Sequence, residues 1–317
     1  MKPTPFGITT IDCQYVYPRF AAAYLMVDQG RAVFIENNTS HAVPLLLQAL
    51  KEQGLKPDCV DYVIITHVHL DHAGGSSALM KACPGARLLA HPRAARHIID
   101  PSKLVSSAKQ VYGEAIFKKL YGEIEPISAE RVQVIEDETV LSWQSRKLRF
   151  FYTRGHANHH FCIHDSVSNG VFTGDSFGIY YPDVGGKPPF VFVTTSPTDF
   201  DPDEAQKSFE KIVATGAERA YLTHFGEIRD LARVKKELSD QMRFSASLLN
   251  QCRVAMKTGQ WNEAQAKAFC ESELKKLWLT QLATRGVQWN ASIEAILKMD
   301  LDLNAAGITY TASKVSS

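Results

Sequence analysis

The chain has 317 residues and a formal net charge of +1, with 35 Lys and Arg against 34 Asp and Glu. Hydrophobic residues make up 45% and charged residues 22%, which is typical of a globular protein and excludes a disordered chain. The balanced charge argues against a nucleic-acid-binding protein, and no apolar run reaches the 18 residues that indicate a membrane span.

The N-terminus lacks the apolar core of a secretory signal, and the six cysteines are scattered without a CxxC pair. In a chain of this length the scattered pattern predicts reduced, mostly buried thiols. We therefore expect a cytoplasmic protein.

The first part of the chain alternates strand-like apolar runs with turns, and one early segment has the apolar spacing of a helix. The helix is expected from Ser40 to about Gln53. Strands are expected at 8–16, 22–27, 32–36, 60–66, 87–91, 131–135, 139–143, 148–153, 161–164, 170–173 and 220–223. A further helix is expected at 203–214. Because strands and helices are mixed with strand–turn–strand pairs, the pattern predicts a layered α/β fold.

All 14 prolines lie between Pro3 and Pro202, so the C-terminal part differs in composition from the rest. Apolar residues at helical spacing predict helices at 227–258, at 262–283 with Asn262 as N-cap, and at 292–299. The expected domains are 1–226, with a helical insertion at about 92–127, and a helical extension at 227–317. The extension could act as a lid or as a homodimer interface.

The strongest chemical signal is the motif HxHxDH, in which His67, His69, Asp71 and His72 fall within six residues. The motif follows the buried strand at 60–66. His67 and His69 are two apart in extended chain and project to one side, whereas Asp71 and His72 open the next helix. Such a cluster of imidazoles and a carboxylate predicts a metal site.

Three more residues of ligand type stand where strands are expected to end. His156 follows the strand at 148–153, Asp175 follows the strand at 170–173, and His224 follows the strand at 220–223. Each lies beside a small residue in a turn, where sites are commonly built on a sheet.

The order HxHxDH, GH, GD and a late His resembles the metallo-β-lactamase-fold hydrolases over residues 7–226, with the glyoxalase-II-like branch as the nearest. The resemblance implies a four-layer αββα sandwich carrying the C-terminal helical extension. It implies that His67, His69 and His156 bind one metal and that Asp71, His72 and His224 bind a second. Asp175 would bridge the two ions, and His160 would support the ligands without binding a metal.

The cofactors implied are two divalent metal ions, with zinc preferred and iron or manganese as alternatives. A bridging water would attack an ester, thioester or lactone carbonyl, with Asp71 orienting it or accepting its proton. The site charge would favour a developing oxyanion. The expected partner is a small-molecule substrate, with neither nucleic acid nor a membrane.

The chain departs from the family pattern at His159, which stands where glycine is usual. It is interpreted as a surface residue in preference to an acid/base group. The aromatic segment 177–192 is expected to line the substrate mouth, with Tyr180 or Tyr181 near the metals. No match to the glutathione-binding pattern of glyoxalase II is found in the tail.

Two other functions stay open at this point. A mononuclear iron enzyme resembling persulfide dioxygenases would use the first three ligands. A weakly catalytic effector or binding protein would use the helical tail as its interaction surface.

Overall fold

The computed structural model describes residues 5–195 and 198–314, and the contacts within it separate two compact units. The chain passes between the units several times. The first unit comprises Met1–Tyr152, His159–Gly174 and Thr215–Arg229, and the second comprises Thr153–Asn158, Asp175–Ala214 and Asp230–Ser317. The domain boundary expected near residue 226 stays a prediction.

The first sheet of the first unit has six strands, and their spatial order follows the sequence. The strands are β1 (Ile8–Asp12), β2 (Ala22–Asp28), β3 (Arg31–Ile35), β4 (Val60–Ile64), β5 (Arg87–Ala90) and β6 (Val132–Val134). Strands β1 to β3 are antiparallel, whereas β3 to β6 pair in parallel. The apolar runs of β3 to β5 suit a sheet that is covered on both faces.

The second sheet also has six strands, in the order β14-β13-β10-β9-β8-β7. The strands are β7 (Val140–Trp143), β8 (Arg146–Tyr152), β9 (Phe161–Asp165), β10 (Gly170–Gly174), β13 (Arg219–Leu222) and β14 (Gly226–Arg229). Among the described strands of this sheet, β10 and β13 pair in parallel and the other neighbours are antiparallel. The sequence did not predict β14, which pairs with β13 where a helix was expected.

A shared apolar core holds the two sheets face to face. Tyr24 and Ile64 of the first sheet lie in one buried cluster with Phe150, Phe172 and Tyr221 of the second. The rings of Phe172 and Tyr221 stack with centroids 4.6 Å apart. The first unit therefore has the sheet-on-sheet arrangement expected for its class.

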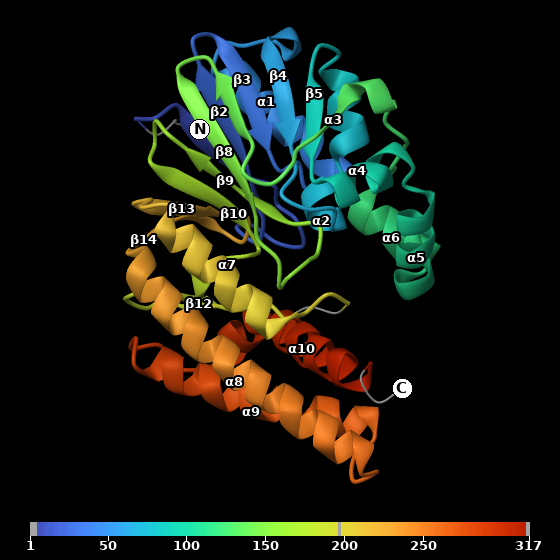
Figure 1. The fold of residues 1–317 in the computed structure, drawn as a ribbon, viewed down its shortest axis with the longest axis vertical. Coiled ribbons are helices and arrows are strands. Elements are labelled where there is room, and N and C mark those ends of the chain that lie inside the picture. Colours follow the sequence, from blue (N-terminus) through green and yellow to red (C-terminus); the bar gives the residue numbers. More distant parts are fainter. Residues whose placement is uncertain (1–4, 196–197, 315–317) are drawn as a thin grey trace. The chain divides into compact units, whose positions relative to one another are not determined.

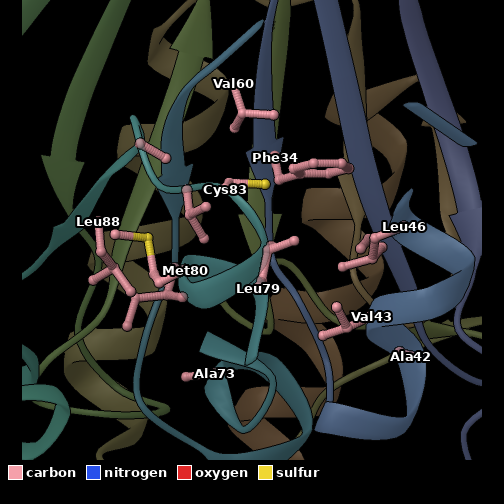
Figure 2. Packing of buried hydrophobic residues seen from close by; sticks show 14 of the residues in the cluster. Phe34, Ala42, Val43, Leu46, Val60, Ala73, Leu79, Met80, Cys83 and Leu88 are labelled. Carbon is pink, nitrogen blue, oxygen red and sulfur yellow. The ribbon is translucent and has the colours of Figure 1, made fainter. Parts of the chain in front are cut away.

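Helices cover the other face of the first sheet (Figure 1). They are α1 (Val43–Glu52), α3 (Ser76–Ala82) and α4 (Pro92–Ile99), and the one-turn α2 (Leu70–Ala73) precedes α3. Figure 2 shows Leu46 of α1 and Leu79 of α3 pointing into the same cluster as Phe34 of β3. Three short 3-10 helices connect elements of this unit at Ser40–Ala42, Pro57–Cys59 and Ala129–Arg131.

The expected insertion is helical but broken. Within the insertion expected at about 92–127 the chain forms two helices after α4, which are α5 (Ser102–Tyr112) and α6 (Glu114–Tyr121). Gly113 separates them with φ 77°, a left-handed conformation that ends a helix and favours glycine.

A β-bulge in β4 holds a residue whose side chain connects the two sheets. Val60 pairs with Ala32 and Tyr62 with Val33, so Asp61 is an extra residue on β4. The Asp61 carboxylate accepts hydrogen bonds from Nε of Arg31 at 3.0 Å and from Nε1 of Trp143 at 2.8 Å. Because Arg31 belongs to the first sheet and Trp143 to the second, Asp61 ties the sheets together.

The second unit consists mainly of long helices. They are α7 (Pro202–Ala214), α8 (Leu231–Lys257), α9 (Glu263–Ala283) and α10 (Ala291–Ser313), with a strand pair β11 (Ile179–Tyr180) and β12 (Val191–Phe192) and the 3-10 helix Pro182–Val184. The buried ring of Trp278 packs on Phe192 at 4.8 Å. No helix among the described residues is long and apolar enough to cross a membrane.

The predicted C-terminal helices exist, but two of their bounds were wrong. The helix expected from 227 begins at Leu231, because 226–229 forms β14 and Asp230 caps the helix. The helix expected at 292–299 runs on to Ser313. Asn262 is confirmed as an N-cap, and it forms a capping box with Gln265.

Candidate metal centre

The HxHxDH segment leaves the end of β4 and gathers its side chains in the first unit. His67 is fully buried, and its Nε2 lies 2.9 Å from Nδ1 of His69. Its ring centroid is 4.0 Å from that of His72. Oγ1 of Thr66 lies 3.0 Å from Nδ1 of His67, which fixes the ring orientation. The six-residue segment therefore brings the imidazoles of His67, His69 and His72 together.

A second group joins this segment to the end of β13. Oδ2 of Asp71 lies 3.4 Å from Nε2 of His224 and 3.8 Å from Nε2 of His72. Each of the three residues offers one ligand atom, and these atoms lie within 4.8 Å of one another. His72 and His224 are buried, whereas the side chain of Asp71 is 29% exposed. The carboxylate is thus the member of the group that solvent or a substrate can reach.

The backbone of the segment before β2 orients His224. Nδ1 of His224 lies 2.8 Å from the carbonyl oxygen of Phe20, and a carbonyl can only accept, so Nδ1 carries the proton. The lone pair of the imidazole is then on Nε2, which faces Asp71. A hydrogen bond of this kind is what orients a histidine ligand toward a metal.

Glu36 performs a similar role for His72, and sequence reasoning missed it. Glu36 is buried at the end of β3, and its Oε2 lies 3.5 Å from Nδ1 of His72. Its Oε1 accepts a hydrogen bond of 3.1 Å from the backbone N–H of Thr66. The available signal was an acidic residue directly after the apolar run 32–35, where a charge is costly unless it is partnered.

His160 packs against His67, and its role in supporting the ligands stays a prediction. It is fully buried, and its ring centroid is 4.8 Å from that of His67. A Cβ at Gly174 would lie 2.4 Å from Nε2 of His160 and 2.5 Å from Oγ1 of Thr66. Gly174 also has φ +48°, so this position requires glycine for both its conformation and its space.

His159, interpreted as a surface residue, is only partly exposed. Its side chain is half-buried, and its ring centroid lies 5.7 Å from that of His69. The backbone N–H of Val68 points to its Nδ1 at 3.4 Å. His159 therefore packs against the histidine cluster.

The other two predicted ligands belong to the second unit and are adjacent there. Nε2 of His156 lies 3.5 Å from Oδ2 of Asp175, and both residues are buried. Oγ of Ser176 donates to the carbonyl of Thr153 at 3.1 Å and so joins the two segments. A Cβ at Gly155 would lie 2.3 Å from the backbone nitrogen of Ala205.

The two tyrosines predicted near the substrate differ in their surroundings. Tyr181 is buried, and its hydroxyl lies 3.3 Å from Oδ1 of Asp300 on α10. Its ring packs on Phe192 with centroids 5.8 Å apart. Tyr180 is half-buried at the end of β11. The contacts of Tyr181 indicate packing, and the substrate contact stays a prediction.

The donor set of the first unit fits a divalent transition metal. Imidazole nitrogens and one carboxylate are the ligands that zinc, iron and manganese share, and no thiolate is present in the group. Nδ1 of His224 donates to the carbonyl of Phe20 and Nδ1 of His72 faces Glu36, so Nε2 of each ring is directed toward Asp71. Fold and site together define a protein with two facing six-stranded sheets and, at the strand ends, a group of residues that could hold a metal ion.

The comparisons with known proteins place the chain in a family. The family model of the metallo-β-lactamase superfamily matches residues 16–224, and the chain belongs to this superfamily. The metallo-β-lactamase fold-containing protein ST1585 of Sulfurisphaera tokodaii is 28% identical over 169 residues, which are 52% of this chain and 60% of that protein. A hydroxyacylglutathione hydrolase of Stenotrophomonas maltophilia is 30% identical over 152 residues, 48% of this chain and 44% of its own length.

The structural comparison confirms the predicted fold class. The crystal structure of ST1585 from Sulfolobus tokodaii matches with a TM-score of 0.65 at 21% identity, covering 96% of this chain and 99% of that one. At this identity the match shows the fold alone. The chain spans only about half the length of these two curated relatives, 60% of the first and 44% of the second.

Proposed function

We propose that this protein is a dinuclear metal-dependent hydrolase that attacks the carbonyl of an ester, a thioester or a lactone. The proposal is supported mainly by the convergence of Asp71, His72 and His224 beside the pair His67 and His69. The proposal adds His156 and Asp175 as the remaining ligands, on the family resemblance. Two zinc ions are the proposed cofactors, and a small molecule is the proposed substrate.

The metal ions would supply an activated bridging water and polarise the carbonyl. The protein residues hold this arrangement. Asp71 is more exposed than His72 and His224. Its carboxylate can bind an ion and orient the attacking water or accept its proton. Glu36 and the carbonyl of Phe20 hold the ring orientations of His72 and His224. His160 and Thr66 pack behind His67 and keep it from turning.

The choice of a carbonyl substrate rests on the curated relatives. Hydroxyacylglutathione hydrolase is the name of two proteins that are similar to this chain over less than half of their own length. The tail carries no match to a glutathione-binding pattern, so we extend the proposal to esters and lactones.

The test combines metal analysis with a substrate panel. We expect about two metal ions per chain after zinc reconstitution, together with hydrolysis of at least one ester, thioester or lactone. His67→Ala, Asp175→Ala and His224→Ala should each lower kcat/KM by about a thousandfold or more. His164→Ala is the matched control, because His164 lies on β9 with its Nε2 3.1 Å from Oδ1 of Asn169.

Other outcomes would favour the alternatives. Fewer than one metal per chain after reconstitution contradicts the proposal. One iron per chain with oxygen consumption on a persulfide would indicate the mononuclear iron enzyme. A biological effect that survives in the His67→Ala, Asp175→Ala double variant would indicate the effector protein.

A further inference from the structure

Two buried cysteines face each other in the helical part of the second unit. Cys252 lies on α8 and Cys270 on α9, and their Sγ atoms are 3.4 Å apart. Both side chains are fully buried, and both thiols are free. The distance makes the pair a hydrogen bond in which one thiol donates to the sulfur of the other. The proposed hydrolytic reaction uses neither residue.

The connection between α8 and α9 brings the two sulfur atoms together. α8 ends at Lys257 and α9 begins at Glu263, so the helices form a hairpin with a short turn at 258–262. Sγ of Cys252 also lies 4.0 Å from the carbonyl oxygen of Ala266, one turn of α9 before Cys270. A disulfide needs its sulfur atoms about 2.05 Å apart, so the two side chains together have to move by about 1.4 Å.

The two thiols differ in acidity. The hydrogen bond from Cys270 lowers the pKa of the Cys252 thiol, although burial acts in the opposite direction. The same contact raises the pKa of the Cys270 thiol, and burial raises it further. At Cys83, which is also buried, burial raises the thiol pKa to about 11. Because the thiolate is the reactive form of cysteine, we expect Cys252 to react before Cys270 and Cys83.

The pair lies close to the exposed end of the hairpin. Val254, two residues after Cys252, is 64% exposed, and residues 257–260 are exposed as well. Helix ends and turns open locally at a lower free energy than the core of a protein. We therefore expect a small uncharged oxidant to reach Cys252 through local opening of this end, without unfolding of the whole unit.

We propose that Cys252 and Cys270 are an oxidation site, at which hydrogen peroxide converts the two thiols into a disulfide between α8 and α9. In the first step the Cys252 sulfur attacks one peroxide oxygen. The O–O bond breaks, a water molecule leaves with the thiol proton, and Cys252 becomes a sulfenic acid.

In the second step the Cys270 sulfur attacks the Cys252 sulfur. The S–S bond forms, the S–O bond breaks, and the hydroxyl leaves as a second water with the Cys270 proton. The two sulfur atoms lose two electrons in total, and the peroxide gains them. The step needs no metal ion and no residue of the candidate metal centre, so the inference is independent of the proposed hydrolytic function.

The disulfide would join the two helices that hold β12. Gln241 of α8 donates from Nε2 to the carbonyl of Val191 at 2.9 Å and accepts from the backbone N–H of Val193 at 3.1 Å. Trp278 of α9 packs on Phe192 between them. A covalent link between α8 and α9 restricts the hairpin, so we expect it to hold β12 more firmly.

The experiment identifies the linked cysteines by mass spectrometry. Purified full-length protein is treated with hydrogen peroxide, alkylated to block the remaining thiols, and digested with trypsin, which cleaves between the two cysteines at Arg253, Lys257 and Lys267. We expect a linked pair of peptides that contain Cys252 and Cys270, about 2 Da lighter than the two reduced peptides together, and its loss on reduction with dithiothreitol. Recovery of both cysteines as separate peptides, alkylated or oxidised to sulfonic acids, would overturn the proposal.

Three variants test the roles of the two thiols. In Cys270→Ser the sulfenic acid should persist on Cys252, where dimedone traps it, whereas Cys252→Ser should give little trapped product at Cys270. Trapping mainly at Cys270 would overturn the assigned order of reaction. Cys83→Ala is the matched control, because it removes a buried thiol outside the hairpin and should form the disulfide as the wild type does. The wild-type digest decides the proposal even if a variant does not fold.

The effect on β12 has its own measurement. Oxidised wild-type protein should melt several degrees higher than reduced protein, and the backbone amides of 191–195 should exchange hydrogen more slowly. Dithiothreitol should reverse both changes, and neither should appear in Cys252→Ser. A disulfide that leaves the exchange at 191–195 unchanged would contradict its effect on β12.

Discussion

The carboxylate of Glu36 lies 3.5 Å from Nδ1 of His72 and joins the end of β3 to the HxHxDH motif. The same carboxylate accepts from the backbone of Thr66, immediately before that motif. One buried acidic side chain thus fixes both the backbone position and an imidazole orientation. This supporting role predicts that Glu36 acts on metal affinity without contacting the metal.

Glu36→Gln should weaken metal binding about 10- to 100-fold, because the amide cannot hold the imidazole as a carboxylate does. Competition with a chromogenic chelator measures the affinity, and circular dichroism checks the fold. Glu52→Gln at the exposed end of α1 is the control and should bind metal as the wild type does. Equal affinity in the folded Glu36→Gln variant would show that the contact is only structural.

Gly174→Ala should lower the free energy of unfolding by several kcal/mol, because the new Cβ would clash with His160 and Thr66 and the backbone has φ +48°. Gly30→Ala separates the two effects. Gly30 has φ +77° with no neighbour within 4 Å of an added Cβ, so it should cost only about 1 kcal/mol. Equal costs in denaturant titrations would show that the close approach to His160 is unimportant.

Asp61→Asn should lower stability at neutral pH by roughly 1 kcal/mol and leave it unchanged in acid. Burial alone would raise the pKa of the Asp61 carboxyl, but hydrogen bonds from Arg31 and Trp143 hold it below its usual value. A lowered pKa means that the carboxylate stabilises the fold above about pH 4 and loses this effect as the pH falls further. Melting temperatures of both proteins from pH 2 to 7 should therefore converge at low pH. A constant difference would contradict the assignment.

Tyr181→Phe and Tyr180→Phe should have different effects. Tyr181→Phe should cost about 1 kcal/mol of stability and leave kcat/KM unchanged, because its hydroxyl is buried against Asp300. Tyr180→Phe should lower kcat/KM on a true substrate with little change in stability. Unchanged kinetics in Tyr180→Phe would remove this segment from the substrate site, and altered kinetics in Tyr181→Phe would reverse the assignment.

The ligand motif could be predicted from the sequence because its residues are close along the chain. His67, His69, Asp71 and His72 lie within six residues, and the turn at the end of β4 is enough to gather them. His224 could be placed from its strand-end position and from the resemblance. Glu36 could not, because its contact with His72 depends on the pairing of β3 and β4, which a single acidic residue does not reveal.

The strands were predicted well where apolar β-branched runs were bounded by turns, as in Val60–Ile64. The error at Leu231 arose because Gly226–Arg229 is polar and short, and only its pairing with β13 makes it a strand. The length of α10 was missed because Gly307 and Thr309 disfavour a helix locally. Both residues are buried there, so packing outweighs their intrinsic preference.

The extra residue in β4 also determines which side chains point to which face. Val60 faces the helices, Asp61 and Tyr62 both face the second sheet, and Val63 faces the helices again. Side chains alternate along a strand, so one added residue inverts the alternation for everything that follows. The bulge thus sets the phase with which the chain reaches His67, at the opposite end of the strand from Asp61. Deleting Asp61 would turn the side chains of the histidine motif toward the opposite face of the sheet. The direction in which these histidines point therefore depends on a residue at the other end of the strand.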